Sequence, residues 1–261
     1  MQALSELIAL WNTNTPWGIY VFVFFISIYL GSFYNVVALR TLSGESIIGT
    51  NENSHCTSCG HELNYLDMVP IFSWLFLKGK CRYCGDKLSP VYPFGELLTG
   101  ISYTVIVWQF GFTLEALVQV VLMTVMIWAT ITDLKEMIVP DRFTVIGLIL
   151  VGILRLVIGE SVSMYFISGL LSFLFLLLIL VLSGGRMGGA DVKLYALIGL
   201  AIGIDGAIGS LFYASFIGVL INLPIMIKKK DSLKIPFVPF ITAGILLIYI
   251  HNIYGFLGEL F

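Results

Sequence analysis

The sequence predicts an all-α polytopic membrane protein with about eight transmembrane helices and a small cytoplasmic zinc-knuckle domain. Hydrophobic residues make up 58% of the 261 residues and charged residues only 11%, whereas a globular chain carries about 25% charged residues. The apolar residues occur in blocks close to the length, about 20 residues, that a helix needs to cross a bilayer. This composition excludes a soluble domain, a disordered chain and a disulfide-rich miniprotein. The net charge of −2 gives no indication of a nucleic-acid partner.

The first membrane span is expected over Ile19–Leu39, which contains no charged residue. It lacks the features of a cleaved signal peptide, because Glu6 rather than a basic region precedes it and no A-x-A-like site follows. Further spans are expected at roughly Pro93–Phe110, Ala116–Thr132, Thr144–Ile158, Met164–Leu182, Leu194–Ile204, Ile208–Ile227 and Phe237–Tyr254. The window at Leu194 is short and rich in glycine, and it reaches full length only if its helix begins nearer Ala190.

In a topology with eight spans, nearly all basic residues lie on one face of the membrane. If the N-terminus lies outside, 13 of the 14 lysines and arginines fall in cytoplasmic segments and only Arg155 lies outside. Lysine and arginine collect in cytoplasmic loops, and one span more or fewer would scatter these charges over both faces. We therefore expect a first transmembrane segment in residues 1–40, a cytoplasmic domain in 41–92 and a transmembrane core in 93–261.

The polar segment 41–92 contains all four cysteines, in two Cys-x-x-Cys pairs that are each followed by glycine. They are Cys56, Cys59, Cys81 and Cys84. The tight turn allows two thiolates to bind one ion, and the glycine permits backbone amides to point at sulfur. This pattern predicts a structural Cys₄ zinc site, which has no open position for catalysis. Free thiols or a redox pair are the alternative, and His55 and His61 beside the first pair are interpreted as ordinary surface residues.

Two aspartates at the ends of apolar windows are candidates for catalysis, because carboxylates close to a bilayer are costly. Asp133 ends one uncharged window, and Asp191 follows a glycine-rich turn; both fall at cytoplasmic ends of expected spans. Two neighbouring carboxylates cannot both ionise easily, so one can act as general base on water while the other donates a proton to a scissile carbonyl. This arrangement is typical of an aspartic protease.

Structural interpretations of these aspartates remain open. Asp191 is also suited to cap a helix N-terminus. Asp133 is suited to anchor its helix at the membrane interface by pairing with Lys135. Asp141 is suited to cap the helix that follows Pro140. The turn before Asp191, at Gly188, Gly189 and Ala190, lacks the phosphate-binding patterns. Its glycines instead favour the close approach of an extended substrate backbone.

Several stretches of the sequence together resemble the type IV prepilin peptidase family, the bifunctional leader peptidases and N-methyltransferases of pilus, competence and type II secretion systems. They are Gly31–Arg40, the two cysteine pairs, Pro70–Arg82, Ser89–Leu97, Asp133–Asp141 and Gly188–Leu194. The resemblance covers nearly the whole chain and implies that Asp133 and Asp191 are the catalytic pair. The GxGD motif of this class of aspartyl protease falls on Gly188 to Asp191, with Ala190 in place of the second glycine.

The resemblance also implies the substrates, the cofactors and the location. It implies prepilins or pseudopilins as partners, cut after a glycine at the cytoplasmic face of a bacterial cytoplasmic membrane, and a structural zinc ion on the four cysteines. It further implies methylation of the new N-terminus from S-adenosylmethionine, although no Rossmann-type fingerprint is present. Glu96 is a candidate for the methyl-transfer step, and an interfacial helix-start residue is the alternative interpretation.

Two other functional classes compete with the peptidase. A proton or ion transporter would use Asp133 and Asp191 as relay carboxylates, and it predicts charges near the middle of the membrane. A non-enzymatic zinc-binding assembly factor would need the cysteines and not the aspartates. The expected partners are the lipid bilayer and the prepilin substrates, with no nucleic acid, and the sequence does not indicate an oligomeric state.

Overall fold

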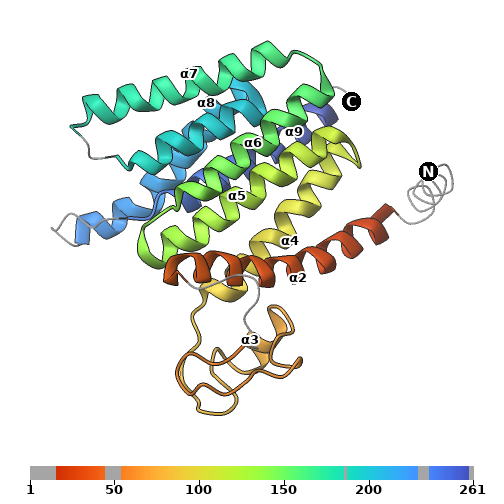
Figure 1. The fold of residues 1–261 in the computed structure, drawn as a ribbon, viewed down its shortest axis with the longest axis vertical. Helices are drawn as coiled ribbons and strands as arrows, with labels where there is room; N and C mark the ends of the chain where they lie inside the picture. Colours follow the sequence, from red (N-terminus) through yellow and green to blue (C-terminus); the bar gives the residue numbers. More distant parts are fainter. Residues whose placement is uncertain (1–15, 45–53, 185–186, 229–234, 259–261) are drawn as a thin grey trace. The chain divides into compact units, whose positions relative to one another are not determined.

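The computed structural model describes residues 16–44, 54–184, 187–228 and 235–258 (Figure 1). Within these ranges the secondary structure is helical, with isolated β-bridges and no strand, so the expected all-α class is confirmed. The signal-peptide argument used Glu6, and the charge argument used Arg186, Lys229, Lys230 and Lys234, all of which lie outside the described ranges. The chain divides into two compact units, residues 1–108 and 109–261.

The first unit contains α2 (Pro16–Ser43), α3 (Phe72–Phe76) and α4 (Val91–Phe110). Helices α2 and α4 approach closely at glycines: a Cβ on Gly31 would lie 2.7 Å from the Cα of Glu96, and one on Gly100 would lie 2.7 Å from Ile28. Small residues allow this approach between apolar helices. The Asn35 amide donates a 3.0 Å hydrogen bond to the carbonyl of Tyr92, which fixes the start of α4 against α2.

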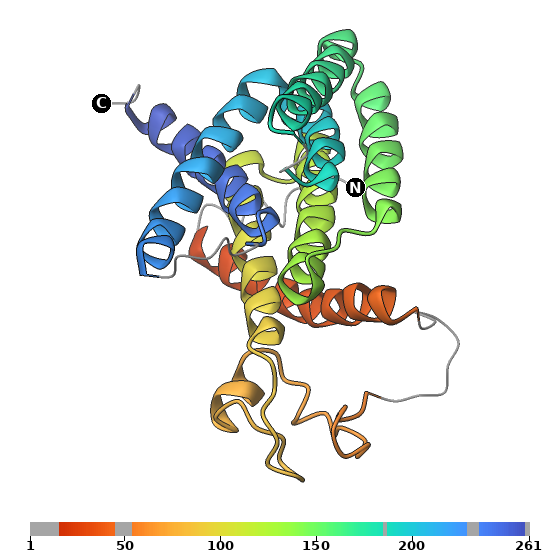
Figure 2. The ribbon, with the colours of Figure 1, turned by 90° about the vertical axis from the view of Figure 1, so that its left-hand side faces the viewer.

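The second unit contains α5 (Leu114–Glu136), α6 (Asp141–Ile158), α7 (Val162–Leu182), α8 (Gly189–Lys228) and α9 (Val238–Gly258) (Figures 1 and 2). The Thr113 hydroxyl caps the start of α5 by accepting a hydrogen bond from the Ala116 N–H at 3.1 Å. Helix α8 packs against α7, α9, α6 and α5. Its contact with α7 is close because glycines lie in the interface: a Cβ on Gly199 would lie 2.5 Å from the carbonyl oxygen of Ser168.

Every apolar window expected from the sequence falls on a helix, except that Phe237 precedes α9, and two of the windows share one element. Helix α8 contains both Leu194–Ile204 and Ile208–Ile227, and it is interrupted only at Gly203. Gly203 has φ 75° and ψ 178°, a conformation that glycine adopts without the steric cost a Cβ would bring. The two segments of α8 consequently run in different directions (Figure 2).

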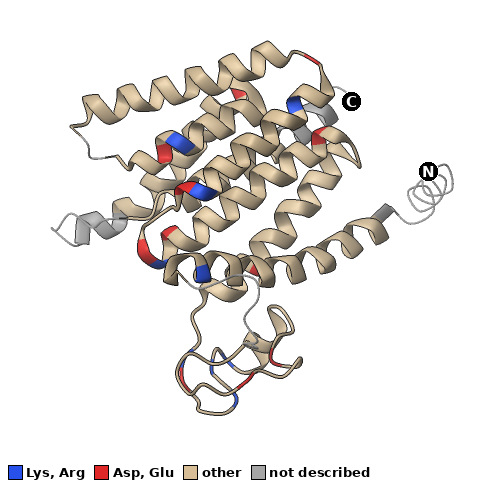
Figure 3. Ribbon diagram, viewed as in Figure 1, with Lys and Arg blue, Asp and Glu red and all other residues tan. Residues whose placement is uncertain are grey.

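Four helices of the described part are long and apolar enough to cross a membrane. They are Trp17–Ser43, Leu114–Glu136, Val162–Leu182 and Gly189–Leu223, and Val238–His251 is a shorter apolar helix. Charged residues are sparse along these helices (Figure 3). The chain is therefore a multi-pass membrane protein, whereas the expected count of eight spans is not confirmed.

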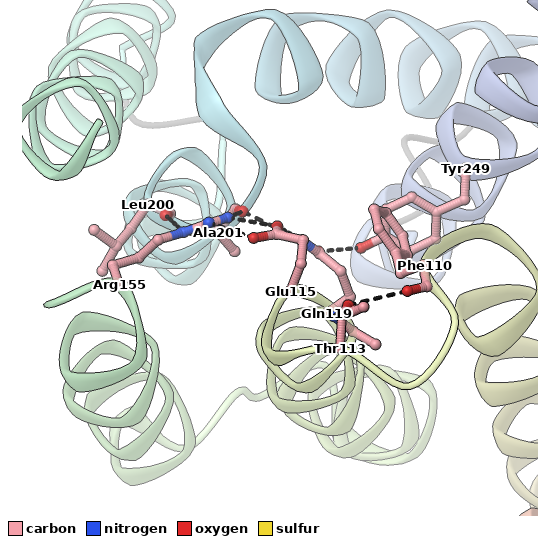
Figure 4. A network of polar contacts seen from close by, with 9 residues as sticks. Phe110, Thr113, Glu115, Gln119, Arg155, Leu200, Ala201 and Tyr249 are labelled. Atoms are coloured by element: carbon pink, nitrogen blue, oxygen red, sulfur yellow. Dashed lines mark hydrogen bonds and ion pairs between the residues drawn. The ribbon is translucent and has the colours of Figure 1, made fainter. Parts of the chain in front are cut away.

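Arg155 is buried in the second unit, with 1% of its surface exposed. Its Nε donates to the carbonyl of Leu200 at 3.3 Å, and its Nη2 donates to the carbonyl of Ala201 (Figure 4). The last carbonyls of a helix have no partner within that helix, and in lipid an unpaired carbonyl is costly. Arg155 thus supplies donors to the carbonyls that the break at Gly203 would otherwise leave open.

The charge of Arg155 is balanced inside the same network. Its Nη1 and Nη2 bind the two carboxylate oxygens of Glu115 at 2.6 and 2.8 Å, and its guanidinium lies 3.5 Å from the centre of the Tyr165 ring. Gln119 donates to Glu115 at 2.7 Å and accepts from the Tyr249 hydroxyl at 2.7 Å (Figure 4). The network therefore joins α5, α6, α8 and α9 around the break.

Candidate functional site

Asp133 lies in the last turn of α5, with 7% of its surface exposed. The helix ends at Met137, whose left-handed conformation directs its N–H to the carbonyl of Asp133 at 2.9 Å. The Asp133 side chain accepts a 3.0 Å hydrogen bond at Oδ2 from the backbone N–H of Val238. Among the described residues, Lys135 forms no ion pair. This part of the structure therefore does not support the interpretation of Asp133 as an interfacial anchor paired with Lys135.

The partner of Asp133 is the N-terminus of α9, which the sequence analysis did not identify. Pro236 and Pro239 flank the start of this helix, and prolines are common at such positions because they need no N–H partner. Since Pro239 has no N–H, Val238 presents one of the few donors at this helix end, and Asp133 accepts from it. The expected span Phe237–Tyr254 located the helix start, but the two residues are 105 positions apart and no sequence signal indicated their contact.

Asp191 lies in the first turn of α8, and it too is 7% exposed. The helix begins at Gly189, so Asp191 lies inside the first turn rather than at the N-cap. A Cβ on Gly188 would lie 3.2 Å from Oδ2 of Asp191, whereas a Cβ on Gly189 would have no neighbour within 4 Å. Gly188 therefore leaves room for the carboxylate, and Gly189 leaves an open approach. Ala190 is half-buried.

Asp133 and Asp191 both belong to the second unit. Both carboxylates are buried, one at the end of α5 and the other at the start of α8. They are close enough for the charge of Asp133 to act on Asp191. Two interacting carboxylates are the arrangement that acid–base catalysis by a carboxylate pair requires.

A salt bridge joins the start of α6 to the start of α8. Lys193 Nζ donates to both carboxylate oxygens of Asp141, at 2.7 and 2.8 Å. Asp141 is the first residue of α6, and the N-cap is Pro140, which offers no side-chain cap. Asp141 therefore does not cap α6 but forms an exposed ion pair that links α6 to α8. Its partner, Lys193, lies two residues after Asp191.

The two cysteine pairs of the first unit have the same backbone geometry. The N–H of Gly60 donates to the carbonyl of Cys56 at 2.8 Å, and the N–H of Gly85 donates to that of Cys81 at 3.0 Å. Both glycines are left-handed, with φ of 70° and 73°, which explains why glycine follows each pair. Backbone N–H groups of Cys59 and Ser58 directed at the Cys56 sulfur lower the pKa of that thiol to about 7.

The four sulfur atoms form one cluster that could hold a metal ion. All four lie within 4.8 Å of one another, and Cys56 and Cys84 are 3.9 Å apart. Tetrahedral zinc with Zn–S bonds near 2.3 Å places its sulfurs about 3.8 Å apart, whereas a disulfide needs about 2 Å. The donor set and the spacing therefore fit a tetrahedral metal ion. Neither His55 nor His61 belongs to the cluster.

Contacts beside the cluster tie the two cysteine pairs together. The His61 and Tyr83 rings lie 3.6 Å apart, and the Asp67 carboxylate accepts from Arg82 at 2.6 Å and from Tyr83 at 3.0 Å. Burial raises the pKa of Asp67, but these hydrogen bonds outweigh burial and hold the pKa below its usual value. Asp67 is consequently ionised at neutral pH and stabilises the loop between the pairs down to acidic pH.

Glu96 holds the segment that precedes α3. It is buried in α4, and its Oε2 accepts a 2.6 Å hydrogen bond from the backbone N–H of Ile71. Ile71 has φ 64° and ψ −52°, a conformation that is costly for a β-branched residue. The structure thus gives Glu96 a local partner within the first unit.

Comparisons with known proteins agree on one family. The model of the bacterial peptidase A24 N-terminal domain matches residues 25–110, and that of the type IV leader peptidase family matches residues 120–223. A prepilin leader peptidase/N-methyltransferase of Bacillus subtilis is 34% identical over 236 residues, which cover 88% of this chain and 93% of the relative. No solved structure matches the chain.

Two further relatives carry the same name. The Myxococcus xanthus protein is 32% identical over 209 residues, covering 78% of this chain and 62% of the relative. The Aeromonas hydrophila protein is 28% identical over 260 residues, covering 88% of this chain and 89% of the relative. The similarity therefore extends through both compact units.

Proposed function

The chain belongs to the type IV leader peptidase family, and from that premise we propose that it cleaves the leader peptide of prepilins or pseudopilins with an aspartate pair and then N-methylates the new N-terminus. The observation that supports the proposal is that Asp133 and Asp191 are both buried, one in the last turn of α5 and the other in the first turn of α8. A transporter would need its carboxylates near the middle of a span, whereas these lie in a last and a first helical turn.

In the proposed reaction one carboxylate is ionised and the other is protonated. The ionised carboxylate removes a proton from a water molecule, whose oxygen attacks the scissile carbonyl carbon, while the protonated carboxylate donates to the carbonyl oxygen. Collapse of the tetrahedral intermediate breaks the C–N bond, and the leaving amine takes up a proton. The N–H of Val238 holds Asp133 in place, and the open face of Gly189 leaves space for the substrate backbone.

We propose that this chemistry takes place at the cytoplasmic face of a bacterial cytoplasmic membrane. The charge distribution supports an outside N-terminus and eight spans, in which the two segments of α8 count separately. Residues 1–40 then form the first span, residues 41–92 the cytoplasmic domain, and residues 93–261 the peptidase core.

Zinc is proposed as a structural ion held by Cys56, Cys59, Cys81 and Cys84. A Cys₄ site is closed, so the ion stabilises a domain with little core of its own. S-adenosylmethionine is the proposed methyl donor for the N-terminal amine. Glu96 stays our candidate for this step, and its hydrogen bond to Ile71 equally supports a role in holding the loop.

The test is a cleavage reaction with purified protein and a prepilin in detergent, followed by mass spectrometry of the product with and without S-adenosylmethionine. We expect loss of the leader in both reactions, and a product heavier by one methyl group at its N-terminus only when the methyl donor is present. An intact substrate would refute the peptidase function, and an unmethylated product would refute the second activity alone.

A further inference from the structure

An uncharged run in the first unit is exposed although its residues are apolar. Residues 68–77 contain no charged residue, and apart from Ser73 all of them are apolar. An apolar run of about 10 residues is too short to cross a bilayer and is typical of a buried core helix or of an interfacial segment. Helix α3 lies within this run and has no buried residue, so the run is not a core helix.

One side of α3 presents three large apolar side chains. Phe72, Leu75 and Phe76 are 41%, 56% and 83% exposed, and their i, i+3, i+4 spacing places them on one face of the helix. Trp74 holds α3 to the rest of the domain, because its Nε1 donates a 3.3 Å hydrogen bond to the carbonyl of Leu88. We call Phe72, Leu75 and Phe76 the apolar face of α3.

The attachment of this segment to α4 brings it level with a membrane-spanning helix. The N–H of Ile71, the residue before α3, donates to Oε2 of Glu96 at 2.6 Å. Glu96 lies five residues after the start of α4 at Val91, which is about 7.5 Å along the helix. On its other side the backbone of Glu96 lies against Gly31, in the uncharged part of the spanning helix α2. The start of α3 is therefore held beside α4 and not beyond its end.

The first charges after the uncharged run are basic. Lys78 and Lys80 are both exposed, and neither belongs to an ion pair among the described residues. The acidic residue before the run, Asp67, is already bound by Arg82 and Tyr83. An apolar face bordered by lysines suits the bilayer interface, where apolar side chains enter the acyl region and lysines are attracted to anionic lipids.

We propose that α3 is an interfacial membrane anchor, in which the apolar face enters the bilayer and Lys78 and Lys80 bind phospholipid head groups. A protein partner could also cover an apolar face. Lipid is the occupant that the position of α3 favours, because a segment level with the second turn of α4 meets the bilayer around α2 and α4 first. The anchor attaches the cysteine-rich domain to the membrane at a third point, and it does not depend on the proposed peptidase function.

The test is photocrosslinking of the full-length protein in vesicles of phosphatidylethanolamine and phosphatidylglycerol. The photoreactive residue p-benzoylphenylalanine replaces Phe76 in the test variant, Phe25 on the spanning helix α2 in the positive control, and Tyr83 between the second pair of cysteines in the negative control. All three side chains are exposed aromatic rings. By mass spectrometry we expect phospholipid adducts at positions 76 and 25 and none at position 83.

The role of the lysines is tested in the same variant at position 76. Lys78→Ala combined with Lys80→Ala should lower the lipid adduct by about 5-fold or more in vesicles with phosphatidylglycerol, since each lysine near an anionic surface contributes about this factor. In vesicles of phosphatidylcholine alone, which have no net surface charge, the same double substitution should leave the adduct unchanged. An equal yield with and without the lysines in the anionic vesicles would remove them from the anchor.

Three outcomes would overturn the anchor itself. One is the absence of a lipid adduct at position 76 in a protein that elutes as folded, while position 25 gives one. Another is an equal lipid yield at positions 76 and 83, which would show no preferential contact of α3 with lipid. A third is a crosslink from position 76 to an added prepilin in place of lipid, which would assign the apolar face to the substrate. None of these readouts requires cleavage, so a failure of the proposed function would leave the test intact.

Discussion

The backbone N–H of Val238, at the start of α9, donates a 3.0 Å hydrogen bond to Oδ2 of Asp133, in the last turn of α5. A main-chain donor cannot rotate away as a side chain can, so the start of α9 fixes one carboxylate of the proposed catalytic pair. The geometry of this helix start consequently affects the acid–base chemistry.

The Val238 donor can be removed without changing a catalytic side chain. Proline is tolerated at the first position of a helix but has no N–H, so Val238→Pro should retain α9 and leave the buried Asp133 carboxylate without this partner. We expect a loss of kcat of at least about 10-fold, because an unpaired buried acceptor costs about 1–3 kcal/mol and Asp133 becomes free to move. The steady-state cleavage rate measures this effect.

Val238→Thr is the matched control, since it keeps the N–H and the β-branched shape, and it should cleave at nearly the wild-type rate. Equal activity of the proline and threonine variants would show that the hydrogen bond does not position Asp133.

The glycines before Asp191 should differ in their response to one added methyl group. A Cβ on Gly188 would lie 3.2 Å from the Asp191 carboxylate, so Gly188→Ala should displace the carboxylate and lower kcat. Gly189 has no neighbour within 4 Å, so Gly189→Ala should fold normally and raise KM if the substrate backbone passes over this face. Michaelis–Menten kinetics separate the two effects. Lower kcat in Gly189→Ala with normal kcat in Gly188→Ala would reverse the assignment.

Replacement of Arg155 should destabilise the protein more than loss of an exposed ion pair. Arg155 supplies donors to Leu200 and Ala201 beside the break at Gly203 and neutralises Glu115. Glu115 is 34% exposed, so the cost of removing Arg155 arises mainly at the carbonyls of Leu200 and Ala201, and a buried acceptor left unpaired costs about 1–3 kcal/mol. We therefore expect a clear fall in the thermal unfolding midpoint of Arg155→Ala in detergent.

The exposed Lys193–Asp141 pair provides the comparison for Arg155. Loss of a surface salt bridge costs about 0–1 kcal/mol, so Asp141→Asn should unfold close to the wild-type midpoint. If Asp141→Asn proved as unstable as Arg155→Ala, the stabilisation of the break by Arg155 would have to be abandoned.

Zinc content should depend on the cysteines and not on the adjacent histidines. Purified wild type should contain one zinc ion per chain by elemental analysis, and Cys56→Ser or Cys81→Ser should lose it, because a three-thiolate site is open and binds less tightly. His55→Ala and His61→Ala should retain the metal, since neither histidine belongs to the sulfur cluster. Full zinc content in both serine variants would exclude the Cys₄ site.

The features that the sequence predicted well are those with local signals. Uncharged runs predicted the positions of the long helices, and glycine after each cysteine pair predicted two matching turns, which the left-handed Gly60 and Gly85 confirm. The continuity of α8 was not predicted, because Asp205 and the glycines around it favour a loop. In the structure Asp205 is exposed, and only Gly203 leaves the helical conformation.

The sequence pattern did not predict the long-range contacts. The charge count placed Arg155 outside, since it treats each arginine as a solvated charge. The structure instead buries this residue against carbonyls 45 and 46 positions away. The hydrogen bond from Val238 to Asp133 likewise depends on how α5 and α9 pack, which no local periodicity encodes.

The most direct test of the central claim is leader cleavage by Asp133→Asn and Asp191→Asn beside Asp205→Asn, an exposed aspartate on the same helix as Asp191. Each amide keeps the shape of its carboxylate but cannot act as an acid or a base, so the loss should resemble that of other essential acid–base residues, about 10²–10⁴-fold or more. We predict no detectable cleavage by either site variant, with normal folding and zinc content, and wild-type cleavage by Asp205→Asn. Wild-type cleavage by Asp133→Asn or Asp191→Asn would contradict the aspartate pair.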